Sequence, residues 1–198
     1  MIDSGVRART AGRCAAVGAL MAFAALGARA APVVYDFESL ADGATVTNQI
    51  AGLAFTDTIA LTAGTTLNEI DFPPQSGSKV VSDDGGAISI VFSALASSVG
   101  AYFTYVAPLT IAAYDAADLL IGSITSAAGD NLGSPNEFIS FADAGGRISR
   151  VVITGDLLGG SFTMDDLTVD SLATVPEPGT AALVLGALPL RRARRHEA

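Results

Sequence analysis

Three residue types that carry much of enzyme chemistry are scarce in this chain of 198 residues. There is no tryptophan, one cysteine and one histidine, and these two, Cys14 and His196, lie near the ends of the chain. The central part therefore cannot build a Ser-His-Asp or Cys-His arrangement, or a histidine-ligated zinc or iron site. A pair of carboxylates, as in glycoside hydrolases, is the enzyme chemistry that the composition leaves open. A glycan-cleaving cleft usually has aromatic platforms, so the lack of tryptophan leads us to expect no enzyme.

Basic residues are the second scarce group. Between Ala31 and Val175 there are seventeen acidic residues and three basic ones, Lys79, Arg147 and Arg150, which gives a net charge of about −14. A surface this acidic is repelled by phosphate backbones, so we expect no nucleic-acid partner. It suits divalent cations, or solubility outside the cell. Without cysteine this part has no disulfides, and its length is enough for one hydrophobic core.

Residues 1–30 have the composition of a secretory signal peptide. Three arginines precede an apolar run from Cys14 to Ala28, and the small residues Ala28 and Ala30 fit a signal peptidase. We predict a signal-peptide helix here, cleaved at or close to Ala30. The alternative is a retained membrane anchor, for which the run is short.

Residues 31–169 predict an all-β domain. Short runs rich in Val, Ile, Phe, Tyr and Thr alternate with clusters of Gly, Asp, Asn, Ser and Pro, and no stretch sustains a helical period. This spacing predicts an antiparallel two-sheet sandwich. We expect strands over 33–38, 53–55, 87–92, 98–105, 109–114, 119–124, 137–141, 148–154 and 161–169, loops over 56–66 and 68–78, and a linker over 170–175.

Four carboxylates lie in the first and last of these strands. Asp36 and Glu38 are two residues apart and so share one face. In the last strand the side-chain alternation reverses across Asp165 and Asp166, which predicts a β-bulge that turns both side chains the same way. If the two strands pair, the four carboxylates could meet around a cation, and their oxygens suit a structural Ca²⁺. The alternative is that all four are solvated ends of strands.

The C-terminal segment has three parts in a fixed order. Pro176 and Pro178 impose extended backbone around Glu177. Gly179 to Leu190 has no charge and would form a short hydrophobic helix of about 18 Å, against a hydrocarbon core of about 30 Å. Such a helix predicts transient insertion into the inner membrane. The arginines that follow would hold its far end in the cytoplasm; they are Arg191, Arg192, Arg194 and Arg195.

This order resembles the PEP-CTERM sorting signal of exported bacterial proteins, which is processed by an exosortase, a membrane protease-transferase. The resemblance covers about residues 175–196, and we place the sorting signal at 176–198. Pro176, Glu177, Pro178 and Gly179 match the signature, and the apolar stretch and "RRARR" follow it. It implies a Gram-negative producer of exopolysaccharide, with exosortase and signal peptidase as partners. It also implies delivery to the cell surface or extracellular matrix after inner-membrane anchoring.

The central domain has a looser likeness to the jelly-roll ectodomains that often precede such signals, in "YDFESLADG", "AYDAADLLIGS" and "FTMDDLTVD". We therefore expect an exported surface or biofilm-matrix protein with a structural or interaction role. The alternative is a carbohydrate-binding module that holds exopolysaccharide, with Tyr102, Tyr105 and Tyr114 as stacking groups. A carboxylate-based glycan hydrolase is the third and least favoured reading.

Overall fold

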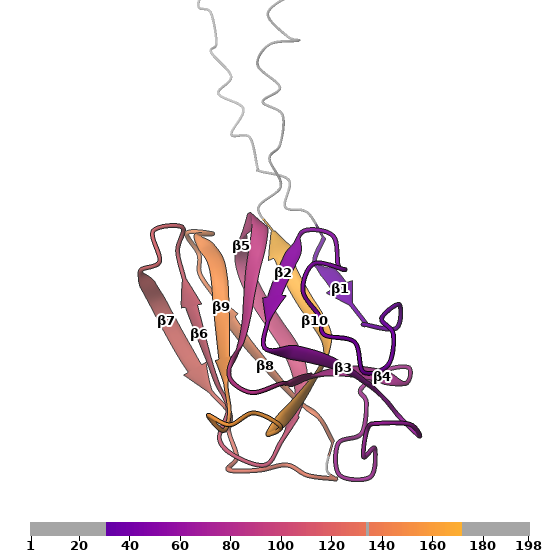
Figure 1. The fold of residues 1–198 in the computed structure, drawn as a ribbon. Helices are drawn as coiled ribbons and strands as arrows, with labels where there is room; N and C mark the ends of the chain where they lie inside the picture. Colours follow the sequence, from indigo (N-terminus) through magenta and orange to yellow (C-terminus); the bar gives the residue numbers. More distant parts are fainter. Residues whose placement is uncertain (1–30, 134, 172–198) are drawn as a thin grey trace, which may run out of the picture.

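The computed structural model describes residues 31–133 and 135–171, and this part of the chain folds into β-strands with no helix (Figure 1). The prediction of an all-β domain is confirmed. The predicted signal peptide and sorting signal lie outside the described residues. Within the described ranges, no helix is long and apolar enough to cross a membrane. The strands are β1 (Val33–Tyr35), β2 (Leu53–Thr56), β3 (Thr58–Thr62), β4 (Lys79–Asp83), β5 (Ile88–Tyr105), β6 (Thr110–Tyr114), β7 (Leu120–Thr125), β8 (Glu137–Ala142), β9 (Ile148–Thr154) and β10 (Phe162–Ser171).

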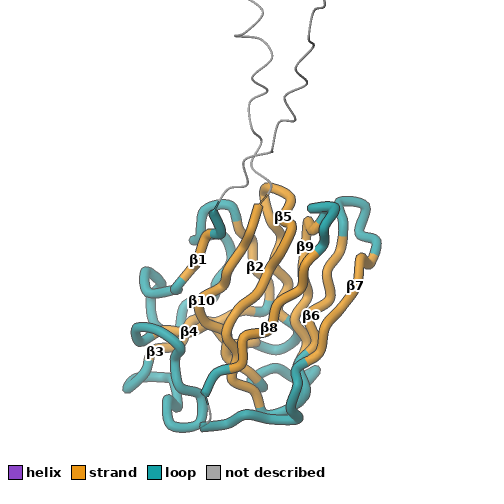
Figure 2. Tube along the Cα trace, turned by 180° about the vertical axis from the view of Figure 1, so that it is seen from behind, coloured by secondary structure: helices purple, strands orange, loops and turns teal. Residues whose placement is uncertain are grey.

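Strand β5 organises the fold. Its first part, Ile88 to Phe92, pairs with β2 and β9, and its last part, Ser98 to Tyr105, pairs with β8 and β10. All these pairings are antiparallel, and they join the described strands into one hydrogen-bonded sheet in the order β3-β4-β10-β5-β9-β6-β7. Two parts of this sheet face each other, one with β6 and β7 and the other with β8, and β8 packs near β6 and β7 (Figures 1 and 2). The sequence predicted two separate sheets, whereas β5 continues from one part into the other.

The core lies between these two parts of the sheet. Alternate residues of each strand point inward, as the two-residue period of a strand requires. In the first part of β5 the inward residues include Ile88 and Ile90, and in the last part they include Phe103 and Tyr105. All four are fully buried. The largest other buried side chains are Phe37, Leu109, Ile111, Ile148, Ile153, Phe162, Met164 and Leu167.

The predicted loop over 56–66 is wrong, because β3 occupies five of its eleven residues and Thr56 is the last residue of β2. Thr58 and Ala60 are the inward residues of β3 and are fully buried. Small or hydroxyl-bearing side chains give little hydrophobic signal. The alternation of buried and exposed residues in β3 therefore could not be distinguished from a polar loop in the sequence. The expected strands over 87–92 and 98–105 are one strand, since Ser93 to Leu95 keep strand backbone while their side chains are exposed.

Two features at the ends of the domain on which the calcium hypothesis depended are present in the structure. β1 pairs with β10, with Val33 opposite Val169. The register of β10 against β5 shifts between Asp165 and Thr168, and Asp166 has a φ of 48°, which is the predicted bulge. β10 also continues to Ser171, so the first residues of the predicted linker belong to the strand.

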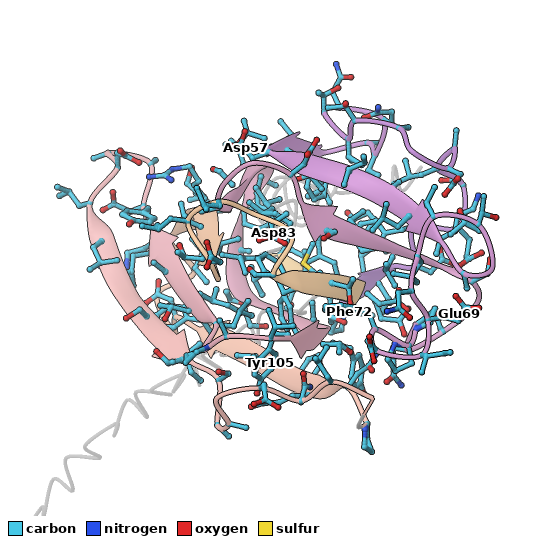
Figure 3. The ribbon with its side chains drawn as sticks, turned by 60° about the horizontal axis from the view of Figure 1, so that its bottom comes forward. Asp57, Glu69, Phe72, Asp83 and Tyr105 are labelled. Carbon is cyan, nitrogen blue, oxygen red and sulfur yellow. The ribbon has the colours of Figure 1, made fainter. Side chains whose placement is uncertain are left out.

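A buried carboxylate fixes the turn that leads into β10. Asp83, at the end of β4, is 2% exposed (Figure 3). Its Oδ1 accepts the backbone N–H groups of Ser161 (2.9 Å) and Phe162 (3.1 Å), and its Oδ2 accepts the Ser161 hydroxyl (2.8 Å). The carboxylate therefore satisfies three donors that have no access to water, which is what a buried charge requires.

Candidate functional site

A row of side chains crosses the outer face of the part of the sheet formed by β2, β5, β9, β6 and β7. In strand order it consists of Ala54, Val91, Arg150, Tyr114 and Leu120, each paired in register with the next. The residues beside them along the strands, such as Ile90 and Val151, are buried in the core, so the row points outward. Five strands at the usual spacing make the row about 19 Å long.

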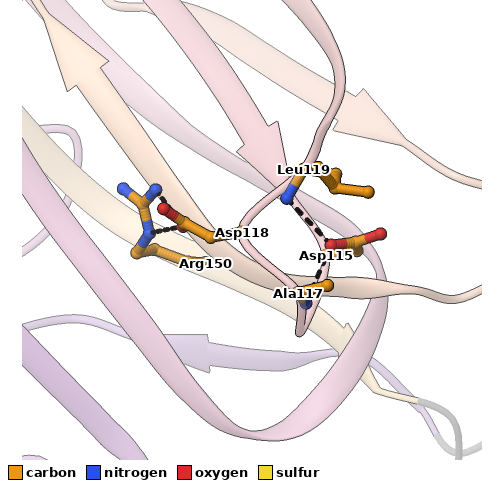
Figure 4. A network of polar contacts seen from close by, with 5 residues as sticks. All are labelled: Asp115, Ala117, Asp118, Leu119 and Arg150. Atoms are coloured by element: carbon orange, nitrogen blue, oxygen red, sulfur yellow. Dashed lines mark hydrogen bonds and ion pairs between the residues drawn. The ribbon is translucent and has the colours of Figure 1, made fainter.

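Arg150 and Tyr114 form the centre of this row. The guanidinium carbon of Arg150 lies 4.2 Å from the centroid of the Tyr114 ring, within the range of a cation–π contact. Arg150 also donates from Nε (3.1 Å) and Nη2 (2.5 Å) to Oδ1 of Asp118 (Figure 4). The ring, the guanidinium and the carboxylate therefore form one cluster, which we call the Tyr114 cluster. Sequence reasoning named Tyr114 and missed both partners.

The loop between β6 and β7 holds Asp118 in place. Asp115 Oδ1 accepts the backbone N–H groups of Ala117 (2.9 Å) and Leu119 (3.0 Å) (Figure 4). The backbone N–H of Asp118 donates to Asp115 O (3.0 Å), and Asp118 takes a φ of 62°, which aspartate tolerates better than most residues. The turn is closed by its own bonds, so the position of Asp118 does not depend on Arg150.

The Tyr114 cluster keeps unused hydrogen-bonding capacity. A guanidinium has five N–H donors, and within the described part of the chain Arg150 uses two of them, both on Asp118 Oδ1. The Asp118 side chain is 74% exposed and that of Arg150 is 24% exposed. An exposed ion pair adds only about 0–1 kcal/mol to stability. The cluster therefore contributes little to the fold and presents donors, an acceptor and a ring to the solvent.

A shallow groove of about 360 Å³ lies at the other end of the row. Ala54 and Val91 belong both to the row and to the lining of the groove, together with Asn48, Ile50 and Phe92. A second groove of about 260 Å³ adjoins it through Ile50 and is lined in part by Asp36. The row thus runs from an apolar hollow to a polar aromatic cluster on one continuous face.

Small side chains, most of them hydroxyl-bearing, cover the rest of this face. The pairings place Thr56, Ser89, Val152, Ala112 and Ser123 in the next row, and Thr154, Thr110 and Thr125 in the one after. Thr110 and Thr125 share a hydrogen bond of 3.1 Å between their hydroxyls. Because none of these side chains is large or charged, the face is open around the Tyr114 cluster.

The structure separates the three predicted stacking tyrosines. Tyr105 is fully buried and its hydroxyl donates to Glu137 Oε2, so the prediction that it stacks on a glycan is wrong (Figure 3). Burial, together with the bond to Glu137, raises the pKa of Tyr105. Its alternation with Phe103 places it in the core, and the sequence pattern could have shown this. Tyr102 is half-buried and packs at 5.0 Å on Phe138, on the opposite side of the fold.

Three of the four predicted calcium ligands, Glu38, Asp165 and Asp166, bind donors of one loop. Asp165 Oδ2 accepts the N–H groups of Gln75 (2.8 Å) and Ser76 (2.9 Å), and Asp166 Oδ1 accepts the Ser76 hydroxyl (2.8 Å). The loop runs from Gln75 to Lys79. Glu38 Oε1 accepts the N–H groups of Ser78 (2.8 Å) and Lys79 (2.7 Å) at the end of this loop. Asp36 stands apart and accepts the N–H of Glu38 (3.2 Å).

Gly77 allows the loop to pass this close to Glu38. It has a φ of 53°, and a Cβ at this position would lie 2.3 Å from Glu38 Oε1. Partial burial opposes ionisation of Glu38, but the N–H groups of Ser78 and Lys79 outweigh it and hold the pKa of Glu38 below its usual value. Burial raises the pKa of Asp165 to about 6, although three backbone N–H groups act against this.

No group of three or more acidic, histidine or cysteine side chains in residues 31–133 and 135–171 is arranged to hold a metal ion. Glu38, Asp165 and Asp166 are instead occupied by loop donors. A structural Ca²⁺ therefore stays a prediction from the sequence. The sorting-signal residues Pro176 to Gly179 and the four terminal arginines lie outside the described residues.

No family model and no curated protein matches the chain. Among solved structures, a cleaved adhesin domain of Lys-gingipain is similar at 15% identity and a TM-score of 0.48, covering 70% of this chain and 99% of that one. A DUF4465 family protein from Bacteroides caccae matches at 14% identity and a TM-score of 0.47, covering 72% and 100%. The CBM22-1 xylan-binding domain from Paenibacillus barcinonensis matches at 11% identity and a TM-score of 0.36, covering 72% and 95%. Values this low assign neither a family nor a function to the chain.

Proposed function

We propose that this protein is an exported, non-catalytic β-domain that binds an extended, uncharged polysaccharide along the row from Ala54 to Leu120. The observation that carries the proposal is the Tyr114 cluster, which stands on an open face of small side chains and in register with a groove. The folded sheet would be a jelly-roll-like sandwich that serves as the scaffold for this face.

The Tyr114 cluster has the chemistry that a sugar ring requires. The apolar C–H face of a sugar packs on aromatic and guanidinium planes, and the sugar hydroxyls need both donors and acceptors. Tyr114 and Arg150 supply the planes and the remaining N–H donors, and Asp118 supplies a carboxylate oxygen. The hydroxyls of Thr110, Thr125 and Ser123 can donate or accept beside them.

The shape and charge of the face narrow the ligand class. A row of about 19 Å across five strands suits a chain of several sugar units better than a single sugar. The net charge of about −14 between residues 31 and 175 repels anionic polymers, so a neutral glycan is the expected ligand. The apolar groove at Ile50 and Phe92 would hold one end of the bound segment.

We predict that Tyr114→Ala and Arg150→Ala each weaken binding to a neutral polysaccharide at least tenfold, because each removes one stacking plane. The measurement is mobility in native gels that contain a xylan, a mixed-linkage glucan or a galactomannan. The unchanged chain should be retarded by at least one of these polymers, and the two variants should run as they do without polymer.

Phe138→Ala is the matched control. Phe138 is an exposed aromatic side chain, 47% accessible, on the opposite side of the fold beside Tyr102. Its removal should leave the retardation unchanged. Equal losses for Phe138→Ala and Tyr114→Ala would place the binding surface elsewhere, and no retardation in any of the three gels would contradict the proposed function.

For delivery we propose export through the signal peptide and processing by an exosortase at the C-terminal signal. The support is the order of the Pro-Glu-Pro triplet, the uncharged stretch and the arginines in residues 176–198. We predict that deleting Pro176 to Ala198 shifts the protein from the surface fraction to the medium or periplasm. Immunoblotting of the cell fractions measures this shift. Deleting only His196 to Ala198, which follow the last arginine, is the control and should change nothing. An unchanged distribution after the long deletion would rule out sorting by this signal.

A further inference from the structure

Strand β7 ends the hydrogen-bonded order of the sheet, and its outer edge is open. It pairs with β6 alone. Among the described residues, no backbone hydrogen bond reaches residues 120–125 from any other segment. All six of its residues are exposed or only partly buried, and Leu120 is 60% exposed. An edge of this kind offers a row of free N–H and C=O groups to another extended strand.

The edge of β7 lacks the features that normally prevent such pairing. Proteins protect edges with lysine, proline, very short strands or a covering segment. From Leu119 to Gly129 there is no charged residue and no proline. Leu119 and Ile124 add apolar surface, at 65% and 38% exposure.

The other one-sided strands differ from β7. β1 has three residues, and β8 contains a charged residue, Glu137, at its start. The far edge of β2 is covered where Phe55 N–H donates to Thr47 O (2.6 Å). The far edge of β3 is covered by residues 43–46, for example through Ala60 N–H and Ala44 O (2.9 Å). The open, uncharged edge is therefore specific to β7.

We propose that β7 is a pairing edge for a second copy of this chain, with the two β7 strands antiparallel about a two-fold axis. An identical strand is self-complementary in an isologous pairing, because each copy supplies the same free donors and acceptors. Two copies with a net charge of about −14 each repel one another over most of their surface, and the uncharged stretch from Leu119 to Gly129 is where this repulsion is smallest.

The side chains select a register centred on Ser123. Paired residues of antiparallel strands share a face. Gly122 and Ile124 both lie on the inner face, since they pair with the buried Ala113 and Ile111. Centring the axis on Ser123 brings Ile124 of one copy beside Gly122 of the other. The Phe141 ring approaches the strand at Gly122, so Ile124 would gain an apolar neighbour there.

The dimer also has a consequence for the ligand, which rests on the proposed function. A two-fold axis normal to the sheet reverses the direction of everything in the plane of the sheet. The two rows from Ala54 to Leu120 would lie on one face but run in opposite directions. A polysaccharide has a chemical direction, so the dimer would hold two separate antiparallel segments and act as a cross-link between them.

The experiment uses the full chain and two opposite charges at one position. Ser123 is exposed, so Ser123→Lys and Ser123→Glu leave the core untouched, yet each places two like charges on the axis. In sedimentation velocity the unchanged chain should form dimers as its concentration rises, and each variant alone should remain monomeric. An equimolar mixture of the two variants should dimerise again, which a folding defect would not allow.

Thr56→Lys is the control, because Thr56 is exposed on the same face but on β2, at the far side. It should dimerise as the unchanged chain does. A chain that stays monomeric at every concentration, larger assemblies without a dimer, or dimers that survive Ser123→Lys would each overturn the proposal. Retardation in polysaccharide gels is read separately, on chains that keep Ser123: if the unchanged chain dimerises and is retarded, and Tyr114→Ala loses the retardation, both proposals stand. If the dimer fails while retardation persists, only the pairing edge is wrong.

Discussion

Replacing Asp83 by alanine should lower the free energy of unfolding by about 3–4 kcal/mol, the largest single effect we expect from a polar residue in this domain. The variant leaves the N–H groups of Ser161 and Phe162 and the Ser161 hydroxyl buried without their acceptor. Each unsatisfied donor costs on the order of 1 kcal/mol or more. A thermal melt followed by circular dichroism should show Tm falling by about 10 °C.

Two further variants distinguish the loss of the Asp83 hydrogen bonds from a general loss of acidic charge. Asp84 is the exposed neighbour of Asp83, and Asp84→Ala should leave Tm within about 2 °C of the unchanged chain. Asp83→Asn keeps one oxygen for the two backbone N–H groups and should recover more than half of the loss. If Asp84→Ala destabilises the domain as much as Asp83→Ala does, the buried hydrogen bonds are not the reason.

Asp165 should make the domain less stable as the pH rises from about 4 to 7. Burial raises the pKa of Asp165 from 3.8 to about 6. The native state therefore binds this proton more tightly than the unfolded chain does, so its stabilising contribution is complete below pH 4 and is lost as the pH rises through 6. Two pKa units correspond to at most about 3 kcal/mol, and partial screening by solvent reduces the expected change to about 1–2 kcal/mol.

Urea unfolding at a series of pH values measures this slope. The general repulsion among the acidic residues acts in the same direction, so the comparison with Asp165→Asn is essential. Asparagine does not titrate, and its carbonyl can still accept the N–H groups of Gln75 and Ser76. The free energy of unfolding of Asp165→Asn should vary less between pH 4 and 7. Identical slopes for the two proteins would show that Asp165 does not titrate in this range.

The strands could be predicted where large apolar side chains alternate, and not where small ones do. The first part of β5 could be predicted because Ile88, Ile90 and Phe92 each place a large apolar side chain on one face. Thr58 and Ala60 are equally buried in β3, but their composition is also that of a loop. The continuity of β5 was hidden by Ser93 and Ser97, since two serines near a change of sheet partner look like a turn in sequence.

The candidate site was less predictable than the fold. Tyr114 could be named from its type, but its partnership with Arg150 depends on a register between strands that lie 36 positions apart in the sequence. The acidic residues were expected to meet around a cation, whereas Glu38 and Asp165 each bind backbone N–H groups of one loop. Their role could not be foreseen, because the loop from Gln75 to Lys79 supplies N–H donors that the sequence does not mark.

The continuity of β5 gives the domain a defined path for mechanical force. Under the proposed function, a polymer held at Tyr114 would pull on β6 and β9, and the proposed attachment at the C-terminal side would pull on β10. The hydrogen bonds that connect these strands run through β5. The force would act on the hydrogen bonds between β10 and β5 along their whole length. Many of these hydrogen bonds would have to break at once, and they would not open one after another. A domain built in this way can remain folded while the material around it is stretched.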